Sequence, residues 1–383
     1  MELQLQSALG IAMMGAKGFG APEVLQAMSQ ARALSERLGD DHQLFMALCG
    51  EASYHMISGH LREADALGHR CMALAKSDES LLLEAHHRQW ATKFFMGDYS
   101  AAKRHLDYGL ATYEPNRHHH LTFTHTGHDP GVCCRNYLTS VLWLQGYPDQ
   151  AVKRAREAVG LAERVSHSLS MVLAAKNLSE VFLWRREPQE ARQVIAEWDA
   201  IASKLALPLL TTQAKFQRGW ALLQEGQADE SVVEMREGIA GIRATGAAMG
   251  LQHFLCVLAQ GYAACGRLEE GMAVLEEALK FAAETQTKYQ YPELLRTKGE
   301  ILLQLDPRKR PAEHWLRTSL ATASEEGTKM LELRAATTLA RLYHDDGDNT
   351  QAREILEPVH AWFAEGFATR DLLEAKSLLE ELA

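Results

Sequence analysis

Apolar and polar positions follow one another along this chain at the spacing of amphipathic helices. The C-terminal stretch 371–380 shows this clearly, because its leucines form one apolar stripe and its charged residues form the opposite face. The chain has only ten prolines in 383 residues and few β-branched residues, and it is rich in Ala, Leu, Glu, Gln and Arg. This composition favours helix nearly throughout, and no strand pattern is visible. We therefore predict an all-α protein.

The helical pattern is interrupted periodically by a short turn that is followed by a small residue. Successive small residues are separated by 38, 49, 40, 40, 40, 41 and 40 positions, and they are Ala64, Ala102, Ala151, Ala191, Ser231, Gly271, Ala312 and Ala352. A period near 40 is typical of a solenoid, in which each unit packs only on its neighbours. A repeat array is not limited to the size of one core, so the whole chain 1–383 can form a single domain.

The segment 146–151, with the sequence GYPDQA, shows how each turn works. The glycine ends the first helix of a pair (helix A) by accepting a left-handed conformation, and the proline opens the second helix (helix B). The small residue Ala151 then allows helix A to cross closely, and a second small residue, Ala158, follows seven positions later. This spacing is that of tetratricopeptide repeats, with helices about one turn longer than usual.

The pattern predicts a right-handed superhelix of about nine tetratricopeptide-like helix pairs. The expected pairs cover residues 2–39, 41–76, 79–114, 131–167, 168–205, 208–246, 248–286, 290–327 and 329–366, with a capping helix at 369–382. The cap follows from the charged outer face of the last segment, because a terminal repeat must present a polar surface to solvent.

One step of 49 residues contains an insertion at 114–130, which carries five of the 17 histidines. Three interpretations stay open: a connector, a loop that folds over the concave face, or a metal site that uses His125, His128, Asp129 or a cysteine such as Cys133. Histidine and carboxylate are suitable metal ligands, but the spacing matches no known zinc pattern. We expect the part 124–131 to turn inward, with Leu121 and Phe123 buried.

The repeat register predicts which helix A residues face the concave groove. The expected set combines charges with aromatic rings: His87, Asn136, Trp143, Lys176, Glu180, Trp184, Phe216, Trp220, His253, Gln260, Arg296, Glu300, Arg334 and Arg341. Such a surface suits a protein, a peptide or a small effector, although a merely solvated face is the alternative. The insertion residues His125, His128 and Asp129 should meet Asn136, Lys176 and Glu180 in this groove.

The net charge and the positions of the cysteines indicate which partners and which cellular compartment to expect. A formal net charge of −10 without a basic tract argues against nucleic acid as a partner. The six cysteines are scattered, which favours reduced thiols and a cytoplasmic protein. No apolar run approaches the roughly 18 residues that cross a bilayer, and the N-terminus lacks the features of a signal peptide. We expect no membrane partner and no cofactor.

Catalysis is not the expected role of this chain. The group Cys133, Cys134, His128 and Asp129 is the least implausible catalytic cluster, but no strand–turn–helix elbow accompanies it. Two partly buried thiols on a helix explain the same residues without any chemistry. The sequence therefore predicts a binding protein rather than an enzyme.

Several turns go beyond a generic tetratricopeptide pattern. They include 16–24 (AKGFGAPEV), 127–132 (GHDPGV), 144–151 (LQGYPDQA), 242–246 (IRATG) and 362–369 (WFAEGFAT). Through these segments the chain resembles, over essentially its whole length, the C-terminal repeat region of large bacterial signalling proteins. In that family a class III adenylate/guanylate cyclase or another output domain is joined to a STAND-type, AAA-like ATPase.

The cyclase and ATPase motifs of that family are absent from this sequence, including the phosphate-binding loop G-x-x-x-x-G-K-[ST]. The resemblance implies a non-catalytic regulatory arm, either a sensor or a scaffold. It also implies an ATPase or cyclase domain as a partner, in cis or in trans.

Overall fold

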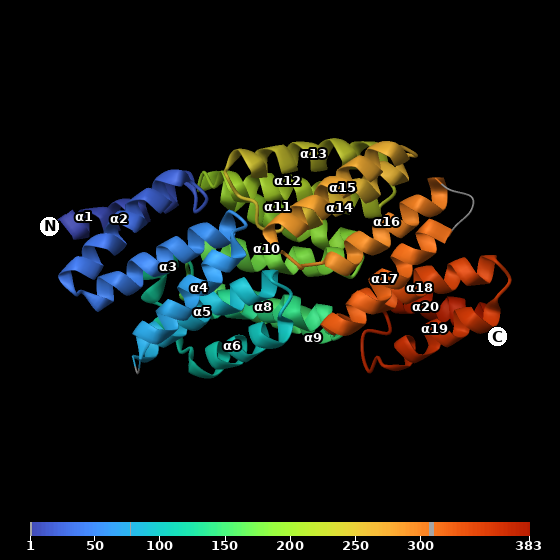
Figure 1. Ribbon diagram of the computed structural model, residues 1–383, viewed down its shortest axis with the longest axis horizontal. Helices are drawn as coiled ribbons and strands as arrows, with labels where there is room; N and C mark the ends of the chain where they lie inside the picture. The colour runs from blue at the N-terminus through green and yellow to red at the C-terminus, as the bar shows by residue number, and fades with distance from the viewer. Residues whose placement is uncertain (1, 77, 306–309) are drawn as a thin grey trace.

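The computed structural model describes residues 2–76, 78–305 and 310–383, and within these ranges every regular element is a helix (Figure 1). Nine consecutive helix pairs and a final helix account for nearly the whole described chain, so the predicted all-α solenoid is confirmed. The pairs are α1 (Glu2–Lys17) with α2 (Pro22–Leu38), α3 (Asp41–Ile57) with α4 (Leu61–Ala75), α5 (Glu79–Phe95) with α6 (Tyr99–Thr112), α8 (Pro130–Leu144) with α9 (Pro148–Val165), α10 (Ser168–Trp184) with α11 (Pro188–Lys204), α12 (Pro208–Gln224) with α13 (Ala228–Ala244), α14 (Leu251–Ala264) with α15 (Leu268–Thr285), α16 (Tyr291–Leu305) with α17 (Arg310–Glu326), and α18 (Lys329–Asp345) with α19 (Asn349–Ala361). The final helix is α20 (Arg370–Glu381).

The eight periodic small residues are all buried, which explains why the repeat requires them. At Gly271 in α15, a Cβ atom would lie 3.0 Å from the carbonyl oxygen of Ala259 in α14. Helices A and B therefore approach so closely that a large side chain at this position would separate them. The inter-repeat core is completed by fully buried tryptophans, among them Trp90, Trp143, Trp184 and Trp198.

The first helices of successive pairs form the inner layer of the solenoid. Contacts run from α3 through α5, α8, α10, α12, α14 and α16 to α18, and each of these helices also packs against its own helix B. The residues that the register assigned to the concave side all lie on this inner layer. Any ligand inside the solenoid would therefore meet helix A side chains first.

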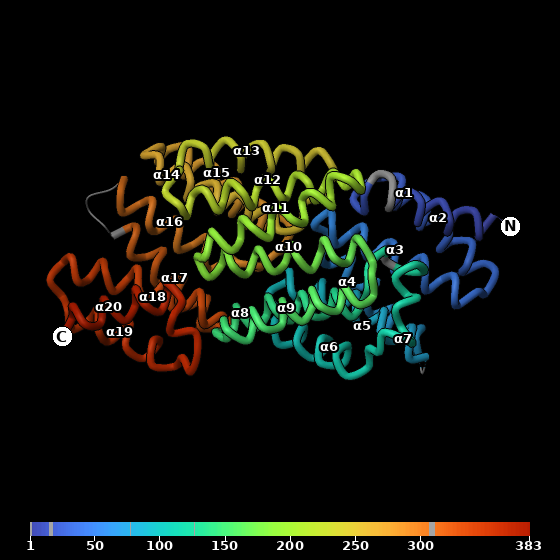
Figure 2. Tube along the Cα trace, turned by 180° about the vertical axis from the view of Figure 1, so that it is seen from behind, coloured from blue at the N-terminus to red at the C-terminus, as the bar shows by residue number. Residues whose placement is uncertain are grey.

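The solenoid winds far enough to touch itself, and we call these places the inter-turn contacts. The carbonyl oxygen of Ile57 accepts hydrogen bonds from the backbone N–H groups of Ala248 (2.9 Å) and Met249 (3.0 Å). The carbonyl oxygen of Phe95 accepts one from Lys288 (3.0 Å). Figures 1 and 2 show the two termini at opposite ends of the molecule, with the later repeats lying along the earlier ones. The concave groove is consequently closed over part of its length.

The last pair differs from the predicted range 329–366, because α19 ends at Ala361. The segment 362–369 leaves the helix and reaches α9, where Glu365 Oε1 accepts hydrogen bonds from the N–H groups of Asp149 and Gln150 at 3.0 Å each. This carboxylate satisfies two of the unpaired N–H groups that every helix start exposes. The predicted pair 290–327 includes residues 306–309, which lie outside the described residues.

Candidate functional site

The inner layer lines a cavity of about 690 Å³, which we call the central cavity. Its walls come from α3, α5, α8, α10, α12 and α14, from the insertion, and from the segments that make the inter-turn contacts. The lining is predominantly apolar and includes Met56, Ile57, Phe94, Tyr137, Leu173, Leu210, Phe254 and Tyr289. A volume in the range of about 300–1,000 Å³ with a few polar groups is typical of ligand pockets.

The insertion forms one wall of this cavity, through His125, Gly127, His128 and Asp129. It is not a plain loop, because it contains the short helix α7 (Pro115–His118) and the π-helix η1 (Thr122–Thr126). Leu121 is buried as expected, but Phe123 is 65% exposed, so that part of the prediction is wrong. Leu121 and Thr122 occupy the interior positions, and the Phe123 ring rests against His119 and His167 on the outside.

Asp129 is a structural residue of the insertion. It is fully buried and caps α8, because its Oδ1 accepts a hydrogen bond from Val132 N–H (3.0 Å). The Tyr113 hydroxyl donates to Asp129 Oδ2 at 2.7 Å, and His119 Nδ1 lies 2.8 Å from the same oxygen. The expectation that Asp129 is available as a metal or groove ligand is therefore corrected. Its oxygens are already used by the protein, and the sequence signal was the N-cap pattern Asp-Pro at a helix start.

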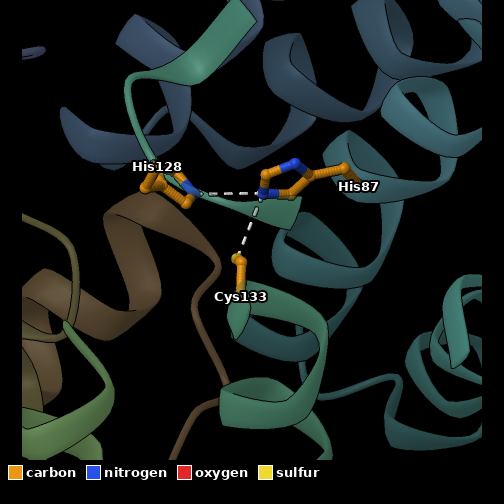
Figure 3. A group of neighbouring side chains, drawn as sticks. All are labelled: His87, His128 and Cys133. Atoms are coloured by element: carbon orange, nitrogen blue, oxygen red, sulfur yellow. Dashed lines mark hydrogen bonds between the residues drawn. The ribbon is translucent and has the colours of Figure 1, made fainter. Parts of the chain in front are cut away.

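Three side chains converge on the cavity wall from α5, the insertion and α8 (Figure 3). His87 Nε2 lies 3.1 Å from Cys133 Sγ and 3.2 Å from His128 Nε2. On its other side His87 Nδ1 lies 3.2 Å from Glu84 Oε2, a buried carboxylate. The sequence suggested His128 and Cys133 as neighbours, but it gave no sign that His87, 46 residues before Cys133, would join them.

Burial disfavours the charged forms of His87 and Cys133, which argues against a nucleophilic role. It lowers the pKa of His87 well below the usual value, with Arg88 adding to the effect. It also raises the pKa of the Cys133 thiol to about 12 and raises that of Cys134 as well. A reactive cysteine needs a lowered pKa, because the thiolate is the attacking species. The arrangement therefore does not favour Cys133 as a nucleophile.

The lining of the central cavity also supplies charge and amide groups. Lys176 Nζ and Glu180 Oε2 lie 3.4 Å apart on α10, and both side chains are mostly buried. Asn136 donates a hydrogen bond to the Leu173 carbonyl (3.2 Å), and Asn177 donates to Ser140 Oγ (3.3 Å). Among the described residues, neither asparagine Oδ1 atom accepts a hydrogen bond. These amides retain acceptor capacity beside the cavity.

A second cavity of about 520 Å³ lies further along the inner layer and is more polar. It holds most of the other predicted groove residues: Trp184, Trp220, His253, Gln260, Arg296, Glu300, Arg334 and Arg341. Burial alone would raise the pKa of Glu293, but Arg296 and Arg334 outweigh it and lower that pKa to about 2. Burial also lowers the pKa of His253 to about 4. This cavity therefore carries a fixed network of ion pairs.

Two predicted groove residues on the inner layer line neither of these cavities. Phe216 is buried in the packing between α12 and α14, where its ring lies 4.6 Å from that of Phe254. Trp143 is also fully buried, stacked on Trp184 and covered by the Arg334 guanidinium. Both corrections have the same cause: the inter-repeat core takes large aromatic side chains from the edge of the inner face. The position of a residue within the repeat does not show whether the residue lies at the edge or at the centre of the inner face.

The comparisons with known proteins agree with the fold. The family model of the tetratricopeptide repeat matches residues 252–277 and 333–358, which lie in the pairs α14–α15 and α18–α19. A protein of Rhizobium meliloti (strain 1021), itself uncharacterised, is 24% identical over 277 residues, or 72% of this chain. The match covers 27% of that relative, so the chain spans about a quarter of the length of the curated relative that it matches.

Two solved structures share the architecture over the whole chain. A Rap protein in complex with competence and sporulation factor has a TM-score of 0.65 at 11% identity, and covers 100% of this chain and 99% of its own. The Rap conjugation regulator of the plasmid pLS20 in complex with the Phr peptide has a TM-score of 0.58 at 12% identity, with 100% and 95% covered. At these identities the likeness concerns the fold alone. Within the described residues, no helix is both long and apolar enough to cross a membrane.

Proposed function

We propose that this chain is a non-catalytic regulatory module that binds a short peptide in its central cavity. The observation that carries the proposal is a mostly apolar cavity whose polar lining includes the Asn136 and Asn177 amides and the Lys176–Glu180 ion pair. A peptide has the matching chemistry, because its backbone N–H groups are donors and its ends and side chains carry charge. A peptide of five residues is about 17 Å long when extended.

The physical support lies in what each wall supplies. Asn136 and Asn177 have amide oxygens with spare acceptor capacity, which backbone N–H groups of a bound chain can use. Lys176 and Glu180 can leave their mutual ion pair and pair instead with a terminus or a charged side chain of the peptide. The aromatic and aliphatic lining gives affinity by burying apolar side chains, at about 25 cal/mol for each Å². The two peptide- or factor-bound Rap proteins of similar fold support the same class of ligand.

We propose further that this module acts as a cytoplasmic sensor arm for an ATPase or cyclase output domain, in cis or in trans. This finer step is supported by the turn motifs that resemble the repeat region of cyclase–ATPase signalling proteins. It is also supported by the length of the Rhizobium relative, most of which lies outside the match. A ligand that binds more tightly to one spacing of the superhelical turns would increase the population of that conformation. The surface that the module presents to the output domain would change as a result.

The test uses pools of synthetic pentapeptides with free termini, labelled for fluorescence anisotropy. We expect at least one pool to bind with a dissociation constant on the order of micromolar. Replacing Lys176 or Asn136 with alanine should weaken that binding at least about tenfold, which corresponds to about 1.4 kcal/mol. The exposed Lys204 on α11 provides the matched control, and Lys204→Ala should leave the affinity unchanged.

Two results would count against the proposal. One is the absence of binding by every pool to folded protein. The other is binding that Lys176→Ala and Asn136→Ala leave unchanged, since it would place the peptide outside the central cavity.

A further inference from the structure

We propose that His87, His128 and Cys133 form a binding site for one Zn²⁺ ion, with a remaining coordination position that faces the central cavity. The three side chains come from α5, the insertion and α8, so the ion would tie the insertion to two helices of the inner layer. All three line the cavity, and their ligand atoms lie within 4.8 Å of one another (Figure 3). The inference is independent of any peptide.

The distances suit a zinc ion. Bonds of about 2.0–2.1 Å to nitrogen and about 2.3 Å to sulfur, at tetrahedral angles, separate two nitrogen ligands by roughly 3.3 Å and a nitrogen and a sulfur ligand by roughly 3.5 Å. The two measured separations are 3.2 Å between His87 and His128, and 3.1 Å between His87 and Cys133. Each of these two separations is within a few tenths of an ångström of the value that zinc requires. Imidazole and thiolate are also the ligand types that zinc prefers.

The hydrogen-bonding capacity of His87 favours a cation at this place. When its Nδ1–H donates to Glu84 Oε2, its Nε2 has a single lone pair in the plane of the ring. Both Cys133 Sγ and His128 Nε2 approach that one lone pair. A neutral ring can accept well from only one of these neighbours at a time. A cation uses the electron pairs of all three ligand atoms at once.

Glu84 supplies the supporting shell that metal-binding histidines usually have. Its carboxylate fixes the His87 ring and makes Nε2 the free ligand atom, the carboxylate–histidine–metal arrangement. Glu84 is fully buried, and among the described residues its Oε1 accepts no hydrogen bond. Arg88, 3.7 Å from Glu84 Oε2, offsets part of this negative charge. A doubly charged ion with one thiolate adds one net positive charge to the region, which this carboxylate stabilises.

Coordination would proceed with a defined proton balance. The Cys133 thiol loses its proton to solvent as the Zn–S bond forms, and each imidazole binds the ion through its unprotonated nitrogen. Three protein ligands leave one tetrahedral position for water or for a donor group of a ligand in the cavity. Because one proton is released for each ion bound, the apparent zinc affinity should increase with pH.

The experiment uses the full chain without an affinity tag, freed of metal with a chelator. Cobalt(II) is added as a spectroscopic probe, and zinc is then added as a competitor, with metal content measured by mass spectrometry. We expect one ion for each chain and a thiolate-to-cobalt charge-transfer band that zinc abolishes. His128→Ala should lower the apparent affinity at least about 100-fold, and Cys133→Ser should remove the charge-transfer band.

Two exposed or partly exposed residues serve as controls for adventitious binding. His120→Ala, on the surface of the insertion, and Cys265→Ser, a partly exposed thiol, should leave affinity and spectrum unchanged. Cys133 is buried and its variant could fail to fold, so His128→Ala carries the test, with far-ultraviolet circular dichroism as the check of fold. The proposal fails if wild-type protein binds no stoichiometric cobalt or zinc, or if His128→Ala binds them as the wild type does. Neither result bears on peptide binding by the metal-free chain.

Discussion

At the scale of single residues, the insertion shows how one carboxylate can hold a segment in place. Asp129 caps α8, accepts a hydrogen bond from Tyr113, and donates its backbone N–H to Ser170 Oγ (2.8 Å) in the next repeat. Burial and the neighbouring Asp129 raise the pKa of Tyr113, so its hydroxyl stays protonated and keeps donating. The wall of the central cavity therefore depends on a residue that does not need to touch a ligand.

This network predicts a large loss of stability for Asp129→Ala. The change removes a helix cap worth about 1 kcal/mol and leaves the buried Tyr113 hydroxyl without its acceptor, at a further cost of about 1–3 kcal/mol. Urea unfolding should therefore show a loss of about 2–4 kcal/mol. Asp40→Ala removes an exposed cap that accepts from Gln43 N–H, and should cost only about 1 kcal/mol. Equal losses of stability for the two variants would contradict the role of Asp129 in holding the insertion in place.

At the scale of elements, equivalent turns differ in what they face. Gly146 and Gly226 both end a helix A and have positive φ angles of 91° and 83°. A Cβ atom at Gly146 would lie 2.5 Å from the Trp362 ring and 2.9 Å from Lys329 Cβ, whereas no atom lies within 4 Å at Gly226 among the described residues. The first turn takes part in an inter-turn contact, and the second is open.

Replacing each glycine with alanine separates the cost of backbone conformation from the cost of the contact. Gly226→Ala should lose about 1–2 kcal/mol from the left-handed backbone alone. Gly146→Ala should lose that amount and about 1–3 kcal/mol more, because Trp362 and Lys329 must move. Thermal or urea unfolding of both variants measures the difference. If both lose the same amount, Trp362 packs against Gly146 too loosely to stabilise the contact.

At the scale of the whole molecule, the superhelix is closed by contacts between residues far apart in the chain. Glu326, at the end of α17, lies near Lys288, whose N–H donates to the Phe95 carbonyl. Burial raises the pKa of Glu326 to about 7, although Lys288 opposes the shift. A titratable group thus lies beside an inter-turn contact.

The raised pKa predicts that stability decreases with pH. Between about pH 4.5, the ordinary value for Glu, and about pH 7 the folded chain binds more protons than the unfolded chain. The free energy of unfolding should therefore fall across this window, by about 1 kcal/mol once the partial exposure of Glu326 is allowed for. Glu326→Gln should flatten this dependence, and the control Glu354→Gln, at an exposed position of α19, should not. Chemical unfolding at several pH values measures the slope, and an unchanged slope in Glu326→Gln would refute the assignment.

The sequence by itself determined the repeat and its phase. A small residue every 40 positions, such as Ala151 or Gly271, reports a local event, the close crossing of two helices adjacent in the chain. Such local contacts repeat regularly, so nine pairs and a cap could be counted without coordinates. The inward course of residues 125–129 was also predictable, because the turn formers around Gly127 and Pro130 leave the chain few other paths.

Only the tertiary structure decided which groove residues meet, because that depends on how far the superhelix winds. A small rotation at each repeat accumulates until Ile57 contacts Ala248 and Phe95 contacts Lys288. The total rotation cannot be predicted from the sequence pattern of any single repeat. Packing between adjacent repeats buries Phe216 in the core. Contacts between adjacent repeats bring His87 to Cys133, and these depend on side-chain directions that the register leaves open. Interactions between residues close in the sequence therefore determined the helices of this protein, and the rotation accumulated over many repeats determined its cavity.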